Sequence, residues 1–177
     1  MTPQELWRWA LRAFYPREKM QTPKRQTMYC YTEGPMMFLG QQVVKLMQDS
    51  GFPAKIHCCY RSADDQGKLF NQVPKVTKAM PYDSAHQYYE AVDIIHPSLG
   101  WNVSEAYWTT LSKCWEIIED KHNLDLSIGH YWNFRDSAHV QLKSWHDFKD
   151  KVGAHKPTED QLNERFREVL PKVWAAR

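Results

Sequence analysis

Apolar residues recur every three or four positions in several stretches of the chain, the spacing of one face of a helix. Amphipathic helices with their apolar stripes on the core are therefore predicted at residues 2–16, 35–50, 104–122 and 158–174. Thr2, Ser104 and Thr158 are suitable capping residues for three of these helices. A shorter helix is predicted at 63–71, where Ser62 can act as the cap.

Other stretches lack this period and are rich in residues that favour strands. They lie at residues 55–61, 90–96, 124–128 and 140–142. We expect them to form a small sheet, covered by the aromatic face of the helix at 104–122. A chain of 177 residues suits one domain with short appendages.

The two ends of the chain differ in composition from its middle. Residues 1–26 carry six Lys or Arg against two Glu and are read as a helix with a basic connection. Residues 27–152 are expected to form the domain, and residues 153–177 a C-terminal amphipathic helix after a hinge at Gly153. These terminal helices could make weak contact with a membrane or a partner chain, although docking on the core is the favoured interpretation.

Charge and hydropathy exclude several classes of protein. The net charge is +2 and basic residues are spread along the chain, so nucleic-acid binding is not expected. No transmembrane segment and no signal peptide are expected, because no apolar run is long enough. We therefore expect synthesis in the cytoplasm. Cys30, Cys58, Cys59 and Cys114 are read as reduced thiols that pack in the core.

Two pairs of residues suggest a metal site. His86 and Asp93 are seven residues apart. At this spacing two side chains cannot meet at one ion on a straight strand or on a helix, so His86 must lie on a bend that folds back beside Asp93. Asp136 and His139 lie three apart, just before a predicted strand. Two His and one carboxylate leave an open coordination position, which is typical of catalytic zinc.

A carboxylate that does not bind the metal would serve as general base. Asp136 is the preferred candidate. Glu90 is a rival, but on a regular strand it points away from Asp93, three residues further on.

Three ordered motifs across residues 55–143 carry a resemblance. They are Tyr60-Arg61-Ser62 with Gln66 and Leu69, Ser84-x-His86 with Ala91-x-Asp93, and Gly129-x-x-Trp132 with Asp136-x-x-His139. In order and spacing this pattern resembles the D-Ala-D-Ala metallocarboxypeptidase family. That family includes VanY-type carboxypeptidases and the L-alanyl-D-glutamate endopeptidases of phage endolysins, and it is related to lysostaphin and the hedgehog domain.

The resemblance implies an α+β fold in which helices flank a small antiparallel sheet, as in hedgehog and DD-peptidase domains. It also implies one Zn²⁺ per chain and assigns roles by position: His86, Asp93 and His139 hold zinc, Asp136 is catalytic, and Arg61, Ser84 and Gln66 lie on the substrate side. The implied substrate is a peptidoglycan stem peptide. Cleavage between L-Ala and D-Glu is preferred over D-Ala-D-Ala cleavage, in a phage endolysin or a virion-associated lysin that acts on the bacterial cell wall.

The chain departs from the family pattern at two positions. Tyr89 and His130 stand where the family usually has glycine, so a narrower or reshaped cleft is expected. His130 is also a candidate for supporting the site from outside the ligand set. These departures leave a second hypothesis open, namely an inactive zinc-containing module that binds cell walls or belongs to the virion structure.

Overall fold

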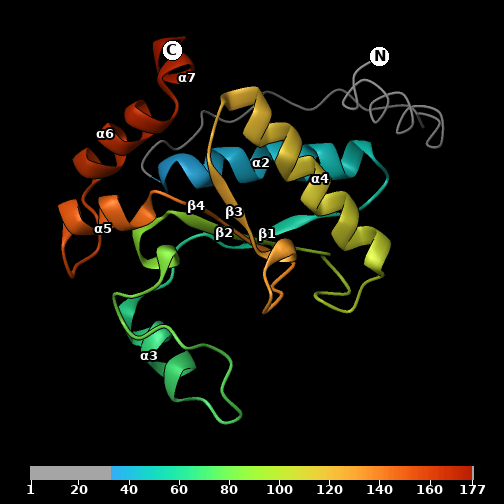
Figure 1. The fold of residues 1–177 in the computed structure, drawn as a ribbon, viewed down its shortest axis with the longest axis horizontal. Coiled ribbons are helices and arrows are strands. Elements are labelled where there is room, and N and C mark those ends of the chain that lie inside the picture. The colour runs from blue at the N-terminus through green and yellow to red at the C-terminus, as the bar shows by residue number, and fades with distance from the viewer. Residues whose placement is uncertain (1–32, 177) are drawn as a thin grey trace.

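Helices α2 and α4 cover one face of a four-stranded sheet, and α3 with the loop after it projects on the other side (Figure 1). The computed structural model describes residues 33–176, so the helix expected at 2–16 lies outside the described part of the chain. Its elements are α2 (Gly34–Asp49), β1 (Lys55–Cys58), α3 (Ala63–Asn71), η2 (Ala85–Tyr88), β2 (Ala91–Ile95), α4 (Glu105–His122), β3 (Leu126–Ile128), η3 (Gly129–Tyr131), β4 (His139–Leu142), α5 (Trp145–Val152), α6 (Glu159–Val169) and α7 (Pro171–Ala175).

The strands run in the order β1-β2-β4-β3, and every neighbouring pair is antiparallel. The expected α+β fold with a small antiparallel sheet is therefore confirmed. β2 lies between β1 and β4 and all five of its residues are buried. Side chains alternate between the two faces of a strand, so β2 can supply the core from one face and a site from the other.

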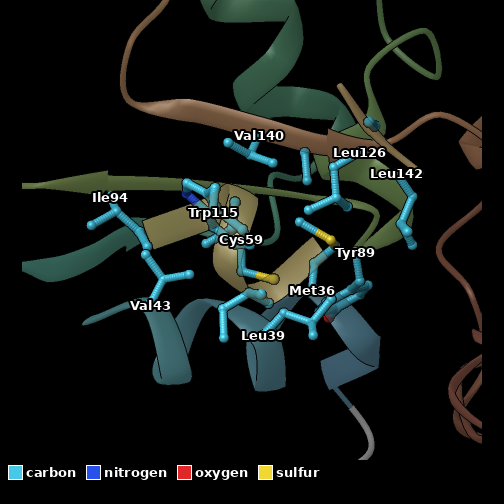
Figure 2. Packing of buried hydrophobic residues seen from close by; sticks show 14 of the residues in the cluster. Met36, Leu39, Val43, Cys59, Tyr89, Ile94, Trp115, Leu126, Val140 and Leu142 are labelled. Atoms are coloured by element: carbon cyan, nitrogen blue, oxygen red, sulfur yellow. The ribbon is translucent and has the colours of Figure 1, made fainter. Parts of the chain in front are cut away.

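The core lies between α2, α4 and the sheet (Figure 2). Trp115 of α4 is fully buried and meets a layer of aliphatic side chains from α2 and the strands: Met36, Leu39, Val43, Ile94, Leu126, Val140 and Leu142. Each such side chain contributes about 1.5–3 kcal/mol when it leaves water. Gly40 lets α2 approach the sheet closely, because a Cβ there would lie 3.2 Å from Ile56 and 3.3 Å from Val92.

The caps predicted at Ser62, Ser104 and Thr158 form, whereas Thr2 lies outside the described residues. Ser62 and Ser104 each accept a hydrogen bond from the backbone N–H three residues ahead. Thr158 and Gln161 form a reciprocal capping box at the start of α6. Among the helices of residues 33–176, none combines the length and the apolar character needed to cross a membrane.

The C-terminal region differs from the prediction in two ways. The single helix expected at 158–174 is wrong, because α6 ends at Val169 and Pro171 opens the separate helix α7. Proline has no N–H to continue a helical ladder and opens a helix readily. The second difference is α5, which the charged sequence after Trp145 concealed, although Trp145, Phe148 and Val152 give it a buried side.

α6 packs on α2. Phe166 is fully buried, and its ring lies 5.6 Å from that of Phe38 in an edge-to-face arrangement. Helix α6 is thus part of the same core as the sheet.

Candidate functional site

Asp93 and His139 face each other across β2 and β4 as directly paired residues. Val92 and Val140, their neighbours along the strands, point into the core, so Asp93 and His139 lie on the face away from α2. Asp93 Oδ1 is 3.0 Å from His139 Nδ1, and the two residues are only 8% and 9% exposed. The sheet register itself places this pair.

His86 reaches the pair from the short 3₁₀ turn η2. Tyr89 adopts a left-handed conformation (φ 61°) that ends the turn, and the Glu90 N–H donates to the Ala85 carbonyl over 3.0 Å. The chain thereby folds back on itself, as the seven-residue spacing requires. His86 Nε2 lies 3.2 Å from Asp93 Oδ1 and 3.1 Å from His139 Nδ1.

The outer nitrogens of both imidazoles face oxygen acceptors. His86 Nδ1 lies 3.3 Å from the Cys59 carbonyl, and His139 Nε2 lies 2.9 Å from the amide oxygen of Gln141. In the neutral tautomers these outer nitrogens carry the protons, and the inner nitrogens present lone pairs to the Asp93 carboxylate. Three electron-pair donors therefore converge on one point, which favours a cation there.

The spacing of the three donor atoms suits zinc. Bonds of 2.0–2.1 Å in a tetrahedral arrangement separate ligand atoms by about 3.3 Å. The observed separations are 3.0, 3.1 and 3.2 Å. Burial alone would lower the pKa of His139, but Asp93 raises it. Burial would also raise the pKa of Asp93, and the two imidazoles overcome this effect and lower it.

The fold is shared with a solved endopeptidase. The structure resembles that of the L-Ala D-Glu endopeptidase ChiX of Serratia marcescens with a TM-score of 0.50, over 67% of this chain and 86% of that chain, at 20% sequence identity. No protein-family model matches the chain, and no curated protein matches it in sequence. The likeness establishes the fold alone, and the roles of individual residues rest on the geometry of the site.

Asp136 is placed by a tight loop that begins at Gly129. The Asp136 N–H donates to the Gly129 carbonyl over 3.0 Å, and the His139 N–H donates to the Asp136 carbonyl over 3.1 Å. A Cβ at Gly129 would lie 2.2 Å from the Asp136 carbonyl oxygen, so only glycine permits this closure. Partial burial of the carboxyl raises the pKa of Asp136, although the residue as a whole is exposed. The charges of His139, Asp93 and His86 also act on that pKa, which sets Asp136 near the three donors.

Arg61 enters the site from the end of β1. Its Nη2 lies 3.8 Å from Asp93 Oδ2, and its Nη1 donates to Gln66 Oε1 over 3.0 Å. The backbone N–H of Arg61 donates to the His86 carbonyl over 3.2 Å, which ties β1 to the turn that carries His86. A partly exposed guanidinium thus stands beside the three donors.

Gln66 is fully buried, and both ends of its amide are engaged. Its oxygen accepts from Arg61, and its nitrogen donates to the Ala79 carbonyl over 2.7 Å. It therefore lies behind Arg61 and contacts the loop that follows α3. Ser84 is half-buried at the start of η2, where its carbonyl accepts from the Gln87 N–H over 3.0 Å.

Glu90, the rival base, is bound by a side chain of helix α6. It is fully buried and makes two-pronged contact with Arg165 of α6, with nitrogen–oxygen distances of 2.7 to 3.2 Å. Burial raises the pKa of Glu90 and Arg165 opposes that shift. A carboxylate held in this way does not reach the site, so Glu90, the alternative that the sequence disfavoured, is not the base.

The two departures from the family pattern are accommodated differently. Tyr89 is turned into the core, where its ring stacks on Tyr60 at 4.5 Å, so it does not reshape the site directly. His130 bonds to Ser137 Oγ over 3.0 Å and packs against the guanidinium of Arg135. His130 thus supports the loop that carries Asp136.

Aromatic residues of the same loop border the donors. The Trp132 ring lies 5.3 Å from that of His139, and its indole N–H donates to Ser127 Oγ over 2.9 Å. Phe134 is 84% exposed. The loop therefore combines one anchored ring beside a donor with one ring open to solvent.

Cys58 is the residue of this site that the sequence did not reveal. We expected it to pack in the core, whereas its sulfur and the donor atoms of His86 and Asp93 all lie within 4.8 Å of one another. The core position belongs to the next residue, Cys59, which is 5% exposed. Cys58, Cys59 and Cys114 are free thiols, in agreement with the prediction for these three residues.

Proposed function

We propose that this protein is a zinc-dependent peptidase that hydrolyses a bond in the stem peptide of bacterial peptidoglycan. The observation that carries the proposal is the orientation of the two imidazoles. Because Cys59 and Gln141 hold the outer nitrogens of His86 and His139, the inner nitrogens are directed at the carboxylate of Asp93. Such an arrangement of donors, with an open position, is typical of catalytic zinc.

Zinc bound to these donors would polarise the scissile carbonyl and lower the pKa of a water molecule to about 7. Asp136 then accepts the proton of the attacking water and returns it to the leaving amine. Its raised pKa suits the proton-accepting part of this role, because a carboxylate with a higher pKa is a stronger base. Trp132 packs beside His139 and borders the proposed reaction site on that side.

Arg61 supplies the substrate contact in this proposal. A guanidinium can bind a carboxylate through two parallel hydrogen bonds, and a stem peptide carries several carboxylates. Gln66 fixes one of its nitrogens, so Arg61 is presented in a defined orientation. We propose the L-Ala–D-Glu bond as the preferred target and a D-Ala–D-Ala bond as the next, in keeping with the activity named for the Serratia endopeptidase. The proposed setting is a phage endolysin or a virion-associated lysin.

Digestion of defined muropeptides tests this proposal. The zinc-loaded protein should release a peptide with D-Glu at its new amino terminus, detected by mass spectrometry, and a chelator should abolish that release. Release of terminal D-Ala alone would move the preference to the D-Ala–D-Ala bond. Zinc-loaded protein that binds cell walls without releasing any peptide would contradict the proposal and favour an inactive module of the same fold.

A further inference from the structure

A β-bulge in β1 changes the direction of Cys58. Ile56 pairs with Ile94, but Cys58 pairs with Asp93, so β1 contains one residue more than β2 between these two points. In a regular antiparallel ladder Cys58 would pair with Val92, whose side chain points into the core. Bulges re-aim side chains in this way and are common next to active sites.

Asp93 consequently has a potential ligand on each side. His139 of β4 and Cys58 of β1 are both its directly paired neighbours. Directly paired side chains share a face of the sheet, with Cβ atoms about 4.5–5.5 Å apart. Cys58 therefore stands on the same face as the three converging donors, across Asp93 from His139.

Burial raises the pKa of the Cys58 thiol, and Arg61 opposes that shift. Arg61 Nη2 lies 3.9 Å from Cys58 Sγ and 3.8 Å from Asp93 Oδ2, so one cation faces both groups. Zinc–sulfur and zinc–nitrogen bonds of about 2.3 and 2.0 Å separate the two ligand atoms by about 3.5 Å. A sulfur within 4.8 Å of the donor atoms of His86 and Asp93 needs a movement on the order of 1 Å to reach that spacing.

We propose that Cys58 is an exchangeable fourth ligand of the metal centre. On binding, the sulfur gives its proton to solvent and bonds to the metal, and the water in the open position leaves; the reverse exchange restores that water. The resting site is then closed by four protein ligands, and substrate or water must displace the thiolate before turnover. This inference rests on the metal centre of the proposed function.

A thiolate in the ligand set also changes which ions the site prefers. Sulfur ligands favour zinc and cadmium over harder ions, whereas two imidazoles and a carboxylate alone discriminate less. Replacing Cys58 by serine should therefore weaken the binding of cadmium more than the binding of cobalt.

The test is the absorption spectrum of the full chain loaded with one equivalent of Co²⁺. Wild-type protein should show a thiolate-to-cobalt charge-transfer band in the near ultraviolet. The Cys114→Ala control, which removes a core thiol of α4, should keep the band. Cys58→Ser should lose it while retaining the visible bands of a cobalt site built from nitrogen and oxygen ligands.

Two results would overturn the proposal and are distinguishable from each other. Wild-type protein that binds one Co²⁺ without the charge-transfer band, or Cys58→Ser protein that keeps it, removes Cys58 from the ligand set and leaves the proposed metal centre standing. Wild-type protein that binds no Co²⁺ and no Zn²⁺ overturns both the ligand role of Cys58 and the proposed function.

Discussion

Glu90 and Arg165 form a buried ion pair that joins helix α6 to the start of β2, the strand that carries Asp93. The side chains are 0% and 4% exposed, and Arg165 Nη2 also donates to Ser144 Oγ over 2.7 Å. Glu90 further accepts the backbone N–H of Leu142 through its carbonyl over 3.0 Å. The pair therefore fixes α6, β2 and β4 relative to one another.

Arg165→Met should destabilise the protein by about 3–5 kcal/mol, because it leaves a buried carboxylate without its partner. Urea unfolding measures this loss. The matched control is Lys113→Met, which breaks the half-exposed pair of Lys113 with Glu116 and should cost less than about 1 kcal/mol. Equal losses for the two variants would contradict the structural role of the buried pair.

The loss in Arg165→Met should depend on pH. Without Arg165, burial raises the pKa of Glu90 with nothing to oppose it. A group whose pKa is raised in the folded state costs stability as pH increases above its unfolded value, which is about 4.3 for Glu. The variant should therefore be closer to wild type in urea unfolding at pH 5 than at pH 8. A loss that is the same at both values would show that Glu90 is not the unpaired group.

Gln66→Ala should weaken substrate binding without removing the metal. The change frees one nitrogen of Arg61 and releases the Ala79 carbonyl, so KM should rise about fivefold, equivalent to ~1 kcal/mol for a lost hydrogen bond. Steady-state kinetics on a stem peptide and zinc analysis measure both effects. Gln72→Ala, at an exposed position just after the same helix, should leave KM unchanged. A fall in zinc content with KM unaltered would contradict the positioning role.

Gln141→Leu tests the orientation of His139. The change removes the acceptor that holds His139 Nε2, so both tautomers of the imidazole become available. Loss of such a partner lowers metal affinity by about 10–100-fold. Competition against a chromogenic chelator measures zinc affinity. An affinity equal to that of wild type would show that Gln141 does not set the tautomer.

Several features of the site were predictable because they depend on local spacing. The bend between His86 and Asp93 follows from a seven-residue offset that no regular element satisfies. The short turn before β4 follows from the three-residue offset of Asp136 and His139. The serine and threonine caps are equally local, since each bonds to a backbone group within three residues.

Features that depend on distant parts of the chain were not predictable. The bulge that re-aims Cys58 is defined only by the pairing of β1 with β2. The sequence of β1 alone therefore does not show that Cys58 pairs with Asp93. The partner of Glu90 lies 75 residues away, which left Glu90 as an apparent rival to Asp136. The buried position of Gln66 depends on contact with a loop that its own helix pattern does not specify.

The Asp136→Asn variant tests the central claim, which is that three residues hold the metal and a fourth moves the proton. The variant keeps the shape of the side chain and removes its ability to accept a proton. Zinc stoichiometry should stay at one per chain, while the rate of stem-peptide hydrolysis should fall on the order of 10²–10⁴-fold. Asp125→Asn, at an exposed carboxylate paired with Lys143, should retain the wild-type rate. Near-normal hydrolysis by zinc-loaded Asp136→Asn protein would contradict the account.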